Sequence, residues 1–141
     1  MRNKFIAIFS VLLALLTFSA CEPDNTLASS DWNGNWKLNE EIIFPQTKTN
    51  IKSAKSSSGT IRIDPNDERK IIISGELFGL SSSESISASA TSSSASFNQK
   101  VGIYTLEGTA TLSGKDQIKF QIKITTENNN AASFSRIAIR I

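Results

Sequence analysis

The chain has 141 residues, which is room for one domain. Lys and Arg total 15 against 13 Asp and Glu, and two of the basic residues, Arg2 and Lys4, lie in a leader segment. The rest of the chain is therefore formally neutral, and it has no basic stripe that would bind nucleic acid. Histidine is absent and Cys21 is the one cysteine, which excludes histidine-assisted nucleophilic catalysis, imidazole and multi-thiolate zinc sites and an internal disulfide, so we expect a non-enzymatic protein without metal or cofactor.

Residues 1–20 have the three parts of a secretory signal peptide. Arg2 and Lys4 are basic, residues 5–18 form an apolar run without charge, and the small residues Ser19 and Ala20 follow. The run of about 14 residues is shorter than the roughly 20 that a membrane-spanning helix needs. We therefore predict that residues 1–20 are removed from the mature protein.

The stretch from Phe18 to Cys21 resembles the lipobox of bacterial lipoproteins. In that family the cysteine thiol receives a diacylglyceryl group, the signal peptide is cut before it, and the new amine receives a fatty acyl chain such as palmitate. The resemblance implies that Cys21 is lipidated, and it gives a role to an otherwise lone cysteine in an exported protein. Two or more acyl chains would anchor the protein stably in a membrane.

Residues 21–31 read as the lipidated cysteine followed by a flexible tether, since they are rich in Pro, Asn, Asp and Ser. The acidic pair Glu22 and Asp24 resembles the surface-export tag of lipoproteins in some Gram-negative groups. The alternative is an acidic tether that faces the periplasm. We expect an outer-membrane location, on either the cell-surface or the periplasmic face.

From Trp36 onward, apolar and polar residues alternate with the period of two that is typical of half-buried strands. In the first half of the chain we predict strands over residues 34–44, 60–64 and 70–74. Asp64-Pro65-Asn66-Asp67 is a turn, because proline fixes φ and the Asx residues cap it.

The serine-rich stretch 81–96 has the composition of a disordered linker. However, Ile86, Ala88 and Ala90 alternate with serines there. We therefore predict a hairpin whose tip lies at residues 91–94, with a register that small side chains specify weakly.

Three more strands are predicted in the last third, over residues 106–112, 115–126 and 133–141. The turns between them are expected at residues 113–116 and 128–130, since glycine and asparagine tolerate left-handed backbone.

About eight strands joined mostly by short turns predict an all-β fold. An antiparallel up-and-down β-barrel over residues 32–141 is the most economical closure, because it leaves no free edges. A two-sheet sandwich is the alternative, although the Cys–Trp–Cys pattern of immunoglobulin domains is missing.

Gly34-Asn35-Trp36 resembles the G-x-W motif at the start of the first strand in lipocalins and related calycins. It follows a short tether after a lipobox, as in small lipocalin-like bacterial lipoproteins. In that family the tryptophan plugs the closed end of the barrel, and an arginine of the last strand packs across it. The resemblance implies that Trp36 is this plug and that Arg136 or Arg140 is its partner. Trp32 either covers the same end or is an exposed aromatic for stacking on a sugar or a partner.

The interior of an eight-stranded barrel is either filled by side chains or holds one small ligand. The predicted inward set is bulky: Leu38, Ile61, Ile63, Ile71, Ile73, Leu106, Leu112, Ile118, Phe120, Ile122 and Ile124. Small residues cluster on the middle strands and could leave a cavity near Leu106 and Phe120: Ala88, Ala90, Gly108 and Ala110.

Two functions therefore stay open. One is a lipid-anchored carrier of a small apolar ligand. The other is a solid scaffold whose loops contact a surface protein or a glycan. Acid–base catalysis has little support, because the adjacent Glu40 and Glu41 point to opposite sides of a strand. The acidic turn at Asp64, Asp67 and Glu68 lacks the pattern of a calcium loop.

Overall fold

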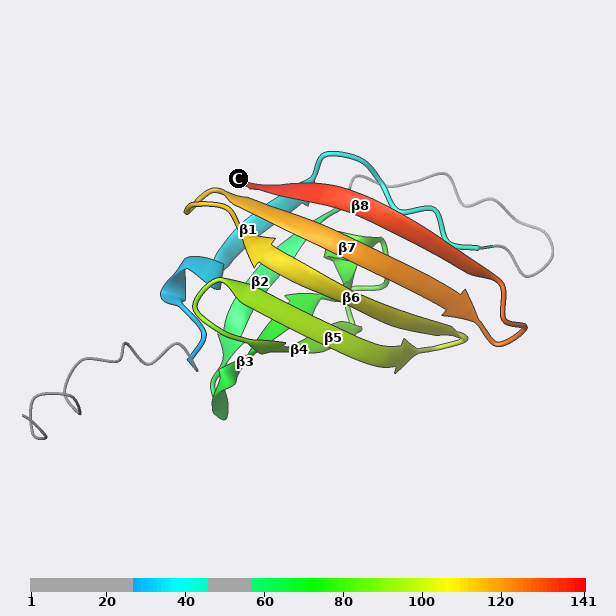
Figure 1. Cartoon of the computed structure of the whole chain (residues 1–141), viewed down its shortest axis with the longest axis horizontal. Helices are drawn as coiled ribbons and strands as arrows, with labels where there is room; N and C mark the ends of the chain where they lie inside the picture. The colour runs from blue at the N-terminus through cyan, green and yellow to red at the C-terminus, as the bar shows by residue number, and fades with distance from the viewer. Residues whose placement is uncertain (1–26, 46–56) are drawn as a thin grey trace, which may run out of the picture.

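The computed structural model describes residues 27–45 and 57–141, which form a closed antiparallel barrel of eight strands (Figure 1). The strands follow one another around the barrel in chain order, and the first pairs with the last to close it. The predicted up-and-down barrel is thereby confirmed, the arrangement fits a lipocalin-like barrel, and the sandwich alternative is excluded. Among the described residues, no helix has the length and apolar content needed to cross a bilayer.

The eight strands are connected by short turns except after β1 and β3. They are β1 (Gly34–Leu38), β2 (Ser58–Asp64), β3 (Asp67–Ser74), β4 (Ser85–Ala90), β5 (Ser94–Val101), β6 (Tyr104–Leu112), β7 (Gln117–Thr126) and β8 (Ala131–Arg140). Two 3-10 turns accompany them, η1 (Ser30–Trp32) and η2 (Gly75–Phe78). The serine-rich stretch forms β4 and the start of β5, so the predicted hairpin is confirmed. Asn129, in the last turn, has the expected left-handed backbone with φ 62°.

Strand β1 is shorter than predicted and ends at Leu38 rather than at residue 44. An asparagine at each end takes over a backbone hydrogen bond of a neighbouring strand. The Asn33 Oδ1 accepts from the Ile63 N–H at 2.7 Å, and the Asn39 Oδ1 accepts from the Ile137 N–H at 2.9 Å. These side chains extend the pairing of β1 where the chain itself leaves the sheet.

The barrel contacts begin earlier in the chain than the predicted boundary at residue 32. The Ala28 N–H donates to the Glu68 carbonyl at 2.8 Å, and the Ser29 hydroxyl caps η1 by accepting from the Asp31 N–H. The last part of the predicted tether is thus part of the folded domain. Cys21 and the predicted signal peptide lie outside the described residues.

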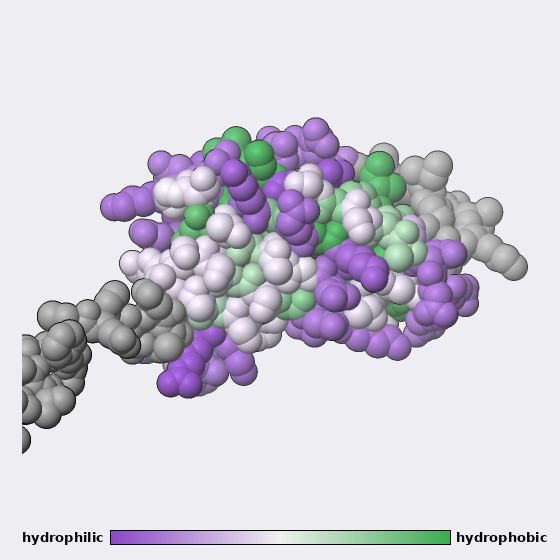
Figure 2. All heavy atoms as spheres, viewed as in Figure 1, coloured by the Kyte–Doolittle hydropathy of each residue, from purple (hydrophilic) through white to green (hydrophobic). Residues whose placement is uncertain are grey.

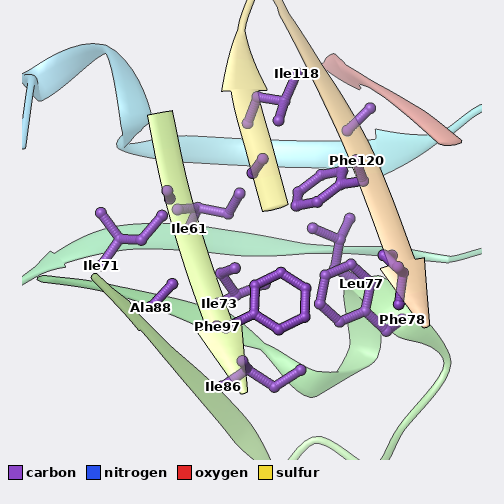
Figure 3. Close-up of a cluster of buried hydrophobic side chains, with 14 of the residues drawn as sticks. Ile61, Ile71, Ile73, Leu77, Phe78, Ile86, Ala88, Phe97, Ile118 and Phe120 are labelled. Atoms are coloured by element: carbon purple, nitrogen blue, oxygen red, sulfur yellow. The ribbon is translucent and has the colours of Figure 1, made fainter. Parts of the chain in front are cut away.

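The core follows the period-two alternation of the strands. All of the predicted inward set is buried except Ile63 and Leu112, which are partly buried and pack against the core. The turn η2 adds two fully buried side chains, Leu77 and Phe78, that the strand pattern did not predict. Figure 3 shows both of them among the side chains of the strands, so η2 fills the barrel from the loop between β3 and β4.

Candidate functional site

Two tryptophans seal the end of the barrel at which the described chain enters. Trp36 is fully buried, and its indole N–H donates to the Trp32 carbonyl at 3.1 Å. Trp32 is also fully buried and donates to the Thr91 carbonyl, in the β4–β5 turn, at 2.9 Å. Because both rings are buried and both indole donors are satisfied, neither ring is available to stack on a sugar. Trp32 therefore covers this closed end, and the exposed-aromatic alternative is wrong.

Arg140 of β8 packs across Trp36, with its guanidinium carbon 4.3 Å from the ring centroid. The same group donates to three backbone carbonyls: Asp31 at 2.7 Å, Asn33 at 2.6 Å and Lys115 at 2.8 Å. A Cβ at Gly34 would collide with this guanidinium, which explains the glycine of the motif. Arg140 thus joins η1, the start of β1 and the β6–β7 turn at the closed end, as the resemblance implied for one of the two arginines.

Arg136 has a different position, and its assignment to the plug is wrong. Its Nε and Nη2 donate to the Glu41 carbonyl at 3.1 and 2.9 Å, and its guanidinium lies over the ring of Phe134. Arg136 precedes Arg140 on β8 and lies further from the closed end, so it holds the segment that leaves β1 rather than Trp36.

The small residues that were predicted to line a cavity are buried in a filled interior. Ala88, Ala90 and Ala110 are buried, and Leu106 and Phe120 are fully buried. Phe78 makes an edge contact with Phe120 at 5.3 Å between ring centroids, and it lies 5.9 Å from Phe97.

Gly108 pairs with Phe97 across β5 and β6, and a Cβ on this glycine would come within 2.8 Å of the Phe97 ring. The aromatic rings of Phe78 and Phe97 thus occupy the space that the small residues leave (Figure 3). Side chains from β5 and η2 therefore pack against Leu106, Phe120 and Gly108 inside the barrel, whereas Ala90, Gly108 and Ala110 are also among the residues that line two open hollows.

Two open hollows lie over strands β3 to β6. One has a volume of about 870 Å³ and the other about 440 Å³, and they share Ser89, Ser96 and Thr109. The larger hollow is lined by short hydroxyl side chains and by three buried alanines, Ala90, Ala95 and Ala110, and Figure 2 shows a pale area of intermediate hydropathy over these strands. Ser and Thr hydroxyls both donate and accept hydrogen bonds, and the alanines beside them add apolar surface, so the hollow offers both polar and apolar contacts.

Charged residues of β3 border the larger hollow. Asp67 and Lys70 form an ion pair at 3.5 Å, and Arg69 is exposed between them. The hollow therefore offers hydroxyl groups beside a cationic side chain.

Below this hollow, the seam between β4 and β5 is held partly by a side chain. Residue pairing across it is confined to Ser89–Ser96 and Ala90–Ala95. Further along, the Gln99 Oε1 accepts from the Ser87 N–H at 3.0 Å, and its Nε2 donates to the Ser85 carbonyl at 2.9 Å. The side-chain amide thus replaces a peptide group of the missing strand pairing. Gln99 is a polar residue at a position of β5 whose side chain points inward in the strand alternation. This is the sequence feature from which its role could have been predicted.

The acidic residues considered for catalysis or calcium do not converge. Among the described residues, no group of three or more His, Cys, Asp or Glu side chains is placed to hold a metal ion. Glu40 makes a 3.6 Å ion pair with Arg136, and Asp64 accepts from the Asn66 N–H within its own turn. These carboxylates serve local structure.

Comparison with protein-family models, with curated proteins and with solved structures found no match.

Proposed function

We propose that this protein is a non-enzymatic, lipocalin-like lipoprotein of the outer membrane, anchored through Cys21, which works as a solid interaction module rather than as a ligand carrier. The observation that carries the proposal is the filled interior, where Phe78, Phe97 and Phe120 occupy the volume that a carrier would leave for its ligand. Because the interior is filled, a partner would have to bind to the outer surface of the barrel.

The open hollow over β3–β6 is the binding face of this proposal. Its hydroxyl groups and the exposed Arg69 can hydrogen-bond a surface glycan or a protein segment, and its alanines add apolar contact for the same partner. The rigid barrel beneath it would keep the hydroxyl groups in place, which reduces the entropy lost on binding.

The lipocalin-like assignment has support from the closed end. The Gly34–Trp36 motif lies beneath an arginine of the last strand, which is the arrangement that the resemblance implies. The lipid anchor rests on the sequence around Cys21. Replacing Cys21 with Ser should move the protein from the membrane fraction to the soluble fraction, and retention in the membrane would overturn the anchor.

Native mass spectrometry of residues 22–141, expressed in a periplasm and incubated with lipid extract, distinguishes a ligand carrier from a solid interaction module. The proposal expects the bare polypeptide mass. Phe78→Ala is the positive control, because it opens a cavity that an apolar molecule can enter. If the wild-type protein carries an additional mass that is lost on denaturation, the interaction-module proposal is wrong and the protein is a ligand carrier.

The binding face is tested with Ser96→Trp, which fills the shared centre of the two hollows. Ser135→Trp on β8 is the matched control, since Ser135 is an exposed strand serine that does not line either hollow. Binding to a glycan array or to cross-linked surface proteins should be lost in the first variant and kept in the second. Equal binding by both would place the partner elsewhere.

A further inference from the structure

Two apolar side chains are exposed on the outer wall of β8, near the closed end of the barrel. Ile139 is 51% exposed and Ile141, which follows the strand, is 68% exposed. Figure 2 shows hydrophobic residues at the surface close to the end of the chain marked in Figure 1, with hydrophilic residues around them. Unlike a single exposed side chain, adjoining apolar side chains rimmed by polar residues are the kind of surface at which proteins contact membranes or other molecules.

Lysines border these isoleucines on both neighbouring strands. Lys37 of β1 is directly opposite Ile139, and Lys119 of β7 is directly opposite Ile137, which is partly buried. Residues that face each other across antiparallel strands have their side chains on the same face of the sheet. Ile137, Ile139, Ile141, Lys37 and Lys119 are hereafter called the β8 patch. On such a face the isoleucines can enter the bilayer interface while each lysine is attracted to anionic headgroups.

The proposed anchor would hold the β8 patch close to the lipid. The chain from Cys21 to Ala28 spans at most about 25 Å when fully extended. Ala28 is bonded to the barrel through Glu68, and three residues later the Asp31 carbonyl accepts from Arg140. The closed end, which includes both Arg140 and Ile141, is therefore the end nearest to the acyl chains.

We infer that the β8 patch rests on the anionic lipid surface of the membrane that holds the acyl chains, so that the barrel lies with its β8–β1 wall against the bilayer. This inference rests on the lipid anchor of the proposed function. It also orients the molecule. The larger hollow is lined by β3 to β6, none of which is adjacent to β8 or β1 in the barrel, so it opens on the wall opposite the β8 patch, while its border at Asp67 and Arg69 adjoins the tether contact at Glu68.

The test attaches an environment-sensitive fluorophore to a single introduced cysteine in the full-length, membrane-extracted protein. The protein is reconstituted into vesicles of phosphatidylethanolamine and phosphatidylglycerol, with and without a spin-labelled lipid that quenches the fluorophore. Ile139→Cys reports on the β8 patch. Ile43→Cys is the matched control, since Ile43 is an isoleucine that is 68% exposed on the segment after β1. Asn66→Cys, exposed in the β2–β3 turn, is the second control.

The inference expects that spin-labelled lipid quenches the probe at position 139 more strongly than the probe at position 66, which lies at the same end of the barrel, and leaves the probe at position 43 bright. Lys37→Glu with Lys119→Glu should weaken the quenching at position 139, as should high salt, because both reduce attraction to anionic lipid. Vesicles without phosphatidylglycerol should have the same effect.

Two failures can be told apart. Equal fluorescence at the three positions on protein that floats with the vesicles would overturn the orientation and keep the anchor. A probe at position 139 that is shielded from water but not quenched would indicate a protein partner on the β8 patch, and it would overturn the lipid contact. Protein that does not float, or wild-type protein whose Cys21 reacts with the fluorophore, would overturn both the anchor and the inference.

Discussion

The ring of Phe97 on β5 lies directly over Gly108, its pairing partner on β6. A glycine in the middle of a strand weakens it, because it has no side chain to pack and loses much entropy on folding. Here the aromatic ring of the neighbouring strand fills the position, so that the pair acts as one packing unit.

Gly108→Ala should therefore destabilise the protein, although alanine has the better strand propensity. The added methyl group meets the Phe97 ring and the Gln121 carbonyl. Overpacking of this kind costs about 1–3 kcal/mol of the free energy of unfolding. Urea denaturation measures it, and Phe97→Leu in the same chain should recover part of the loss. Equal stability of Gly108→Ala and wild type would contradict the contact.

Phe78→Ala should lower the free energy of unfolding by about 3–5 kcal/mol, because it removes a fully buried ring that contacts two other aromatic rings. The variant should also gain affinity for small apolar molecules, detectable as a rise in melting temperature with added benzene. Ile43→Ala, at an exposed position, is the control and should change stability by less than about 0.5 kcal/mol. A Phe78→Ala protein as stable as wild type would mean that η2 does not fill the barrel.

Arg140→Lys should be almost as damaging as Arg140→Ala. Lysine keeps the charge but cannot reach three carbonyls in different directions while it lies over Trp36. We expect a loss of about 2–4 kcal/mol for the alanine variant, from charge-assisted hydrogen bonds and the cation–π contact. Thermal unfolding measures the change, with Arg62→Ala on the exposed face of β2 as the control. A fully stable Arg140→Lys protein would show that charge alone matters at this position.

Gln99→Glu should loosen the β4–β5 seam locally. The carboxylate can still accept from the Ser87 N–H, but it cannot donate to the Ser85 carbonyl and instead repels it. Loss of the hydrogen bond to the Ser85 carbonyl costs about 1–2 kcal/mol of local stability. Where local opening of the seam controls exchange, this corresponds to roughly 5–30-fold faster hydrogen exchange of the Ser87 amide. Hydrogen exchange at the Ile72 amide on β3 is the internal control and should not change. Unchanged exchange at Ser87 would contradict the bridging role.

The strands and their order could be predicted from the sequence because each strand alternates apolar and polar residues, as β7 does from Ile118 to Ile124. The serine-rich hairpin followed from the same alternation against its composition. In both cases a local pattern determines a local structure.

The state of the interior could not be predicted, because it depends on contacts between distant segments. The alternation gives the direction of Ala88 and Ala110, but it does not reveal that Phe78, in a loop, enters the same space. The contacts of the two arginines could not be predicted for the same reason. Arg136 and Arg140 share one phase of β8, and only the paths of η1 and of the segment after β1 decide which of them meets Trp36.

The bridge made by Gln99 has a consequence for how the protein avoids joining with copies of itself. A barrel is protected from strand exchange because all of its edges are paired. Here β4 and β5 share two residue pairs, and beyond them β4 would present free peptide groups if Gln99 did not occupy them. The uncharged side-chain amide of Gln99 therefore occupies peptide groups of β4 that would otherwise be unpaired. A variant without this amide would leave them free to pair with a strand of another molecule, which leads to domain-swapped dimers and larger aggregates.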